Sequence, residues 1–84
     1  MNEQDTYRTN DMGLVAYFYY HGLQEHSRDW DDGVCWWVFK DNEILNTLFQ
    51  RWIGHAAEVE PRRYNSAYSK ARRSFYEDKR SQAT

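Results

Sequence analysis

The residues of this chain best suited to chemistry are the arginines and lysines of its last 24 residues. Residues 61–84 carry seven bases and two acids, whereas residues 1–60 carry four bases and eleven acids, so the net charges are +5 and −7. At 100° per residue, five of these bases fall on one side of a helix. Grouped in this way, they are suited to contact phosphates or an acidic protein surface. The five are Arg62, Arg63, Lys70, Arg73 and Arg80.

This basic face has two interpretations. It is either a solvated helix surface without a ligand, or a surface that contacts the phosphates of nucleic acid. A merely solvated face usually mixes acids and bases, whereas this one holds no acid before Glu77, which favours the second interpretation. Four phosphate contacts would make log K fall with log salt at a slope of about −3.6.

Two adjacent tryptophans form a second candidate feature. Trp36 and Trp37 lie in the apolar run 34–39, which is bounded by Gly33 and Lys40 and predicts a strand buried on both faces. Because side chains alternate across a strand, the two indoles point in opposite directions. If helices cover only one face of the sheet, one indole is exposed and can stack on an unpaired base. Trp36 therefore joins the candidate nucleic-acid-binding residues.

A third feature is the acidic cluster that precedes Gly33. An EF-hand loop beginning at Asp29 would need an oxygen ligand at position 5 and Glu at position 12, but glycine and lysine stand there. The Asp-Gly pair that ends the cluster instead predicts a hairpin turn with solvated acids. The alternative function for Asp29, Trp30, Asp31 and Asp32 is a surface that binds a protein partner.

Side chains suited to metal binding or nucleophilic catalysis are scattered. His21, His26, Cys35 and His55 match no short Cys-x₂-Cys or His-x₃-His spacing. Cys35 lies within the apolar run, where burial raises the pKa of a thiol and keeps it unreactive. The four glycines form no phosphate-binding loop. The sequence therefore predicts a non-enzymatic protein with no metal and no cofactor.

Strands and helices are expected to alternate along the chain. Apolar residues at helical spacing, such as Leu14, Tyr17, Phe18 and His21, predict a first helix that is covered on more than one side. A stripe from Ile44 to Ile53 predicts the apolar side of a second helix. The expected elements are strands at 7–9 and 34–39, and helices at 10–21, 42–53 and 61–77. Residues 23–30 form either a strand that ends at Trp30 or a loop.

Cap and turn residues separate these elements. One of Thr9, Asn10 and Asp11 is expected to cap the first helix, and Asp41 the second. Gly22 and Gly54 are suited to end the two helices. Pro61 stands where the first turn of the third helix tolerates proline.

These elements predict a single α+β domain of residues 1–84. We expect a two- or three-stranded sheet packed by the first two helices, with the third helix laid across the remaining apolar edge. The ends, 1–6 and 80–84, are expected to be frayed. Because 18% of the residues are aromatic, the domain can build a rich core despite its small size.

Composition also predicts the compartment. One cysteine permits no intrachain disulfide, which is typical of a reducing environment. Neither a signal peptide nor an apolar stretch of about 20 residues is apparent. The expectation is a cytoplasmic protein without membrane contact.

Three segments resemble a small domain family. Residues 7–17, 36–41 and 59–61 are similar to its T-x-D-x-x-L-A-A-Y helix start, its F-x-F-x-D strand end and its P-x-x-[FY] helix start. The family is an uncharacterised prokaryotic and phage family of about this length. The resemblance implies a compact α+β fold and a phage or mobile-element origin, and it transfers no catalytic residue. The acidic segment 29–32 and the doubled tryptophan depart from the pattern.

Two functions follow as hypotheses. The first is binding of DNA or RNA through the basic face of the third helix. The second is a protein-interaction module, such as a phage-encoded inhibitor or adaptor that binds a host protein through its acidic and aromatic surface. Self-association as a homodimer through an edge strand or aromatic patch is compatible with the second.

Overall fold

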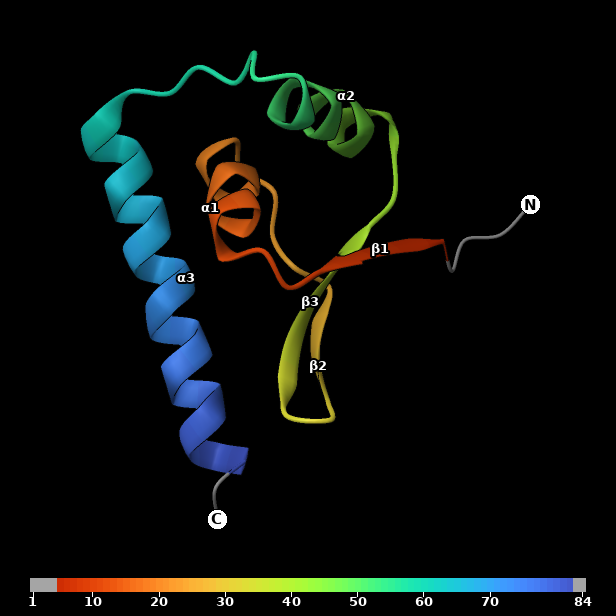
Figure 1. The fold of residues 1–84 in the computed structure, drawn as a ribbon, viewed down its shortest axis with the longest axis vertical. Coiled ribbons are helices and arrows are strands. Elements are labelled where there is room, and N and C mark those ends of the chain that lie inside the picture. The colour runs from red at the N-terminus through yellow and green to blue at the C-terminus, as the bar shows by residue number, and fades with distance from the viewer. Residues whose placement is uncertain (1–4, 83–84) are drawn as a thin grey trace.

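A computed structural model describes residues 5–82 and shows three strands and three helices arranged as an α+β domain (Figure 1). The element order along the chain agrees with the prediction. The elements are β1 (Thr6–Thr9), α1 (Met12–Tyr20), β2 (Ser27–Asp31), β3 (Val34–Lys40), α2 (Glu43–Ile53) and α3 (Pro61–Gln82).

The three strands form one antiparallel sheet in the order β1-β3-β2. Pairing sets Tyr7 opposite Phe39 and Trp30 opposite Cys35. The predicted hairpin turn is confirmed. Asp32 and Gly33 have φ values of 56° and 81°, and a two-residue type I′ turn requires positive φ at both of its central residues. The apolar run therefore forms the central strand, flanked by two short edge strands.

Helix α1 is the centre of the core. Its residues from Leu14 to Tyr19 are all buried, so the helix is covered around its whole circumference, as its continuous apolar sequence predicts. Asp11 is the N-cap and accepts hydrogen bonds from the N–H groups of Gly13 and Leu14. Gly22, with φ of 87°, follows the end of the helix. The sheet, α2 and α3 all surround this one helix.

Helix α2 differs from the prediction in its cap and in its apolar stripe. Asn42, and not Asp41, is the N-cap, and its side chain accepts from the N–H of Leu45. Leu45 and Leu48 are buried, but Ile44 and Ile53 are 62% and 51% exposed. At 100° per residue these two isoleucines lie about 180° apart, at opposite edges of the stripe. Packing against α1 covers only the centre of the stripe.

Helix α3 packs along α1. This differs from our prediction that it would lie across the remaining apolar edge of the sheet. Ala67 and Ala71 are buried in this contact, and their small side chains let the two helices approach closely. The helix meets the sheet through Phe75. The centre of its ring lies 5.5 Å from the ring centre of Trp30 and 6.1 Å from that of Trp37. The sheet is therefore reached by the C-terminal half of α3, while the N-terminal half contacts α1.

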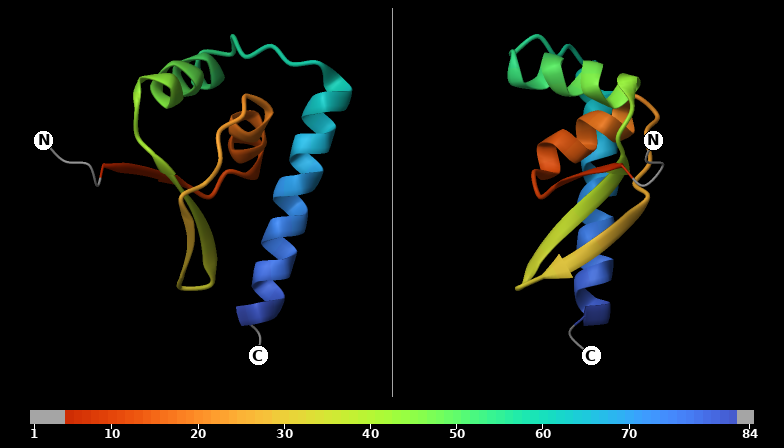
Figure 2. Two further views of the ribbon diagram at one scale, coloured as in Figure 1. Left: turned by 180° about the vertical axis from the view of Figure 1, so that it is seen from behind. Right: turned by 90° about the vertical axis from the view of Figure 1, so that its right-hand side faces the viewer.

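The molecule is flat, with extents of 40 × 39 × 19 Å, and α3 runs along one edge of it (Figures 1 and 2). Helix α3 continues to Gln82 and β1 begins at Thr6, so regular structure extends further than we predicted. The other residues of the expected frayed ends, 1–4 and 83–84, lie outside the described part. No helix within the described residues is long and apolar enough to cross a membrane.

Candidate nucleic-acid interface

The first turn of α3 is fixed by bonds from both sides. The carboxylate of Glu60 accepts hydrogen bonds from the N–H groups of Arg62 and Arg63, and its carbonyl accepts from Tyr64. Glu60 therefore caps the helix, with Pro61 in the first turn as predicted. The Tyr64 hydroxyl donates to the carbonyl of Gly13, 2.9 Å away. These contacts fix which side of α3 faces α1 and which faces solvent.

Three arginines form the outermost row of the helix. At 100° per residue, Arg62, Arg73 and Arg80 lie within about 20° of one another and at roughly 160–180° from Ala71. Ala71 is completely buried, whereas the three arginines are exposed. The row therefore points away from the domain. Helix α3, which carries the row, runs along one edge of the molecule (Figure 1).

Four further bases flank this row. Arg63 and Lys70 lie on the side of α1, each 4.8 Å from the centre of a tyrosine ring, Tyr20 and Tyr19 respectively. These cation–π contacts hold the two charges at the junction of the helices. On the opposite flank are Arg72, 5.9 Å from the ring of Tyr76, and Lys79, 5.9 Å from the ring of Phe75. All four are exposed.

Arg72 and Lys79 were missed by the sequence reasoning, although they stand on the same helix. At 100° per residue, they lie about 80–100° from Arg62 around the helix axis, on the side opposite to Arg63 and Lys70. They therefore fall outside the basic face that the sequence analysis defined. We refer to all seven bases together as the basic surface of α3. Its members are Arg62, Arg63, Lys70, Arg72, Arg73, Lys79 and Arg80.

The charges of this surface are not neutralised by the domain itself. In the part of the chain that the structure describes, the only ion pair joins Arg28 to Glu25, at 3.7 Å. Of the two acids on α3, Asp78 points inward and only Glu77 is exposed. The basic surface thus presents seven positive charges and one negative charge to solvent, a distribution that attracts anions.

Trp36 does not share this surface. Its neighbour Trp37 points toward α3, so Trp36 lies on the opposite, helix-free face of the sheet. It is half-buried, with the guanidinium of Arg8 stacked 4.4 Å from its ring centre. Asp29 is its direct neighbour on β2. An indole already covered by an arginine and next to a carboxylate is a poor platform for a nucleic-acid base.

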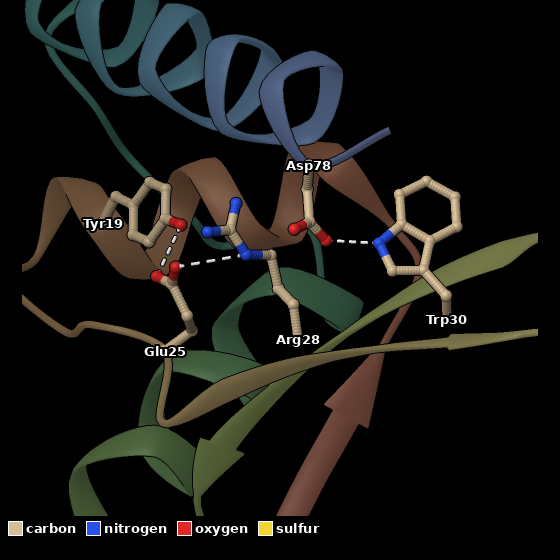
Figure 3. Close-up of polar contacts among 5 residues, drawn as sticks. All are labelled: Tyr19, Glu25, Arg28, Trp30 and Asp78. Atoms are coloured by element: carbon tan, nitrogen blue, oxygen red, sulfur yellow. Dashed lines mark hydrogen bonds and ion pairs between the residues drawn. The ribbon is translucent and has the colours of Figure 1, made fainter. Parts of the chain in front are cut away.

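The acidic candidates are divided between the two faces of the hairpin. Asp29 and Asp31 lie on the helix-free face and Asp32 in the turn, and all three are exposed. Trp30 alternates to the other face, where it packs on Phe75 and donates to the carboxylate of Asp78 (Figure 3). Three acids therefore gather at the tip, while the tryptophan predicted to accompany them belongs to the contact with α3.

A polar cluster lies between β2 and α3. The Tyr19 hydroxyl donates to Glu25 at 2.6 Å, and Glu25 also pairs with Arg28 (Figure 3). Burial, followed by the hydrogen bond and the charge of Glu25, raises the pKa of Tyr19. Burial, and then the charge of Asp78, raises the pKa of the nearby Cys35 thiol to about 11. A thiol with this pKa stays protonated at neutral pH and is a poor nucleophile.

Asp78 is expected to fasten the C-terminal half of α3 to the hairpin. The substitution Asp78→Ala leaves the half-buried Trp30 N–H without its charged acceptor and should cost about 1–3 kcal/mol of unfolding free energy. Asp78→Asn keeps an acceptor oxygen and should cost less. Urea unfolding measures both values. Equal stability of Asp78→Ala and the unmodified protein would show that this bond contributes nothing.

Alkaline pH is expected to destabilise the fold. Burial raises the pKa of Cys35 from 9.0 to about 11, and it also raises the pKa values of Tyr7, Tyr19 and Tyr64. Above pH 9 the unfolded chain therefore loses protons that the folded chain retains, so the free energy of unfolding falls as pH rises. Urea midpoints at neutral pH and near pH 11 should show the decrease, and Cys35→Ala should remove part of it. A constant midpoint would contradict this account.

Comparisons with protein-family models, with curated proteins and with solved structures found no match for this chain. The resemblance of segments 7–17, 36–41 and 59–61 to a prokaryotic and phage family stays a prediction.

Proposed function

We propose that this protein binds nucleic acid by contacting backbone phosphates with the outermost row of α3. The observation that carries the proposal is the row itself: Arg62, Arg73 and Arg80 are exposed, aligned and without an ion-pair partner in residues 5–82. Guanidinium groups suit phosphates because their planar donors match two phosphate oxygens at once.

The dimensions of the row also suit a phosphate backbone. At a rise of 1.5 Å per residue, Arg62 and Arg80 are separated by about 27 Å along the helix axis, with Arg73 between them. A straight row of this length equals the axial rise of about eight base pairs of duplex at 3.4 Å per step, so its arginines can reach phosphates at separate points along one side of the nucleic acid. The flanking bases Arg63 and Lys70 widen the contact on one side, and Arg72 and Lys79 on the other.

The remainder of the molecule restricts how the nucleic acid can bind. Residues 1–60 carry a net charge of −7, so most of the domain outside α3 repels phosphates. Contact from one side, by phosphate-binding residues only, gives affinity with little sequence preference. The proposal is therefore a low-specificity binder that lies on one side of DNA or RNA. The cytoplasmic location and the phage or mobile-element origin expected from the sequence belong to this proposal.

Fluorescence anisotropy of labelled single- and double-stranded oligonucleotides tests the proposal. Saturable binding is expected, with Kd values at physiological salt in the range of about 10⁻⁴–10⁻⁶ M that phosphate contacts alone usually provide. An unchanged anisotropy with both oligonucleotides at low salt would refute it.

A second candidate function is favoured by the hairpin tip. Asp29 and Asp31, on the face opposite to α3, and Asp32, in the turn, form an exposed cluster of three negative charges. Such a cluster can imitate phosphates and bind a basic surface of another protein, as an inhibitor or adaptor would. Binding that depends on these acids and not on the arginines of α3 would favour this function over the first.

A further inference from the structure

The C-terminal ends of α1 and α2 and the beginning of α3 meet beside an open cavity. The cavity has a volume of about 410 Å³ and is lined by Trp52, His55 and Ala57. These three residues belong to the end of α2 and to the connector 54–60, which leads to the first turn of α3. Figure 2 shows the course of this connector. Its volume falls within the range of small-molecule sites, about 300–1,000 Å³.

The wall of this cavity is aromatic and held in place. The indole of Trp52 packs on Tyr17, with ring centres 5.4 Å apart, and its Cζ2 and Cη2 atoms lie against Gly13. His55 follows in a tight turn, with φ of 60°, in which the N–H of His55 bonds to the Trp52 carbonyl. The ring of Trp52 is therefore positioned by its contacts with α1, and the tight turn fixes the backbone from which the ring of His55 projects.

Positive charge surrounds the same corner. Arg51 stands next to Trp52 at the end of α2, and Arg63 lies over Tyr20 at the start of α3. Partial burial lowers the pKa of His21, the C-cap of α1, and the charges of Arg51 and Arg63 lower it further. Both arginines therefore act on the space between the helices. The connector contributes Glu58 and Glu60, but Glu60 is engaged as the cap of α3. Together with Arg62, the corner keeps a net positive charge.

We infer that this cavity receives one unstacked base of a single strand whose phosphates lie along α3. The base stacks on Trp52 and His55, and its phosphate lies near Arg51 and Arg63, from which the strand continues onto the basic surface. This inference rests on the proposed function and adds a preference for single-stranded over fully paired nucleic acid. Aromatic stacking of one base strengthens binding by about 5- to 150-fold.

The test compares two labelled oligomers of equal length and charge, an oligothymidylate and an abasic oligomer, by anisotropy with the whole protein. We expect the unmodified protein to bind the oligothymidylate at least about 5-fold more tightly, because only that oligomer carries bases that can stack. Trp52→Leu should remove this preference without weakening binding of the abasic oligomer. Ile44→Ala, on an exposed position at the opposite end of α2, serves as the control and should preserve the preference.

A second variant covers the case in which Trp52→Leu does not fold, since Trp52 also packs on Tyr17. His55→Gly removes one ring at a position whose positive φ suits glycine, and it should reduce the preference at unchanged stability. Equal affinity of the unmodified protein for both oligomers would overturn the cavity inference and leave the proposed function intact. Binding of neither oligomer would overturn both. An undiminished preference in folded Trp52→Leu or in His55→Gly would place stacking elsewhere and overturn the cavity inference.

Discussion

Reversing the charge of the outermost row is expected to abolish binding to nucleic acid. The triple variant Arg62→Glu, Arg73→Glu and Arg80→Glu replaces three attractive contacts with three repulsive ones along one line of phosphates. We expect the affinity for an oligonucleotide to fall by about 100-fold or more at low salt. Anisotropy titration measures the change. Because the three side chains are exposed and form no ion pair in the described part of the chain, the urea midpoint should change little.

The matched control changes the same number of residues, at the acidic tip of the hairpin. Asp29→Asn, Asp31→Asn and Asp32→Asn remove three exposed acids and should preserve oligonucleotide binding or strengthen it slightly, because the net charge becomes less negative. Asparagine also tolerates the positive φ of position 32. If the arginine variant still binds the oligonucleotide as tightly as the unmodified protein does, the basic surface of α3 is not the interface.

Removing α3 is expected to unfold the domain completely. A chain that ends at Gly54 loses Ala67 and Ala71, which are buried against α1, and the rings of Tyr64, Tyr68 and Phe75, which pack on the core. Loss of one buried aromatic side chain alone costs about 3–5 kcal/mol. The sum exceeds the total stability of a typical small domain, about 5–15 kcal/mol. Far-UV circular dichroism and a urea titration should show no cooperative transition.

A milder truncation provides the control. A chain that ends at Asp78 keeps the contacts of Phe75 and Asp78 with Trp30 and removes residues that are not part of the core. It should unfold cooperatively, like the full chain. Cooperative unfolding of the chain that ends at Gly54 would contradict the central role of α3 in covering α1.

Much of the fold could be predicted because the decisive signals are local. The apolar residues 14–19 leave no polar side for α1, and the Asp32-Gly33 pair permits the left-handed turn of the hairpin. The packing partners of α3 were predicted less well. Ala67 and Ala71 indicate that another element packs closely on this side of α3. The apolar pattern of one helix does not reveal whether that element is a sheet or another helix.

Less of the candidate site could be predicted. Helical spacing identified the outermost arginines, since a wheel depends only on the angle per residue. It gave no reason to expect that Arg8 would cover Trp36, because that contact depends on which strands are neighbours. Trp30 was grouped with the acidic residues beside it in the sequence. In the structure, side chains alternate along β2, so Trp30 points away from these acids and toward Asp78. The cavity at Trp52 is lined by the end of α2 and the connector after it, and the position of the indole there depends on its packing against Tyr17 of α1, which is distant in the sequence.

The salt dependence of oligonucleotide binding tests the central claim most directly. If four of the seven bases of the basic surface, the three arginines of the row among them, each displace a counterion from duplex DNA, a plot of log K against log salt has a slope of about −3.6. Between 50 and 200 mM salt the affinity should then decrease by about 150-fold. A slope near zero, or an unchanged slope after Arg62, Arg73 and Arg80 are replaced by glutamate, would contradict the assignment of this helix as a phosphate-binding surface.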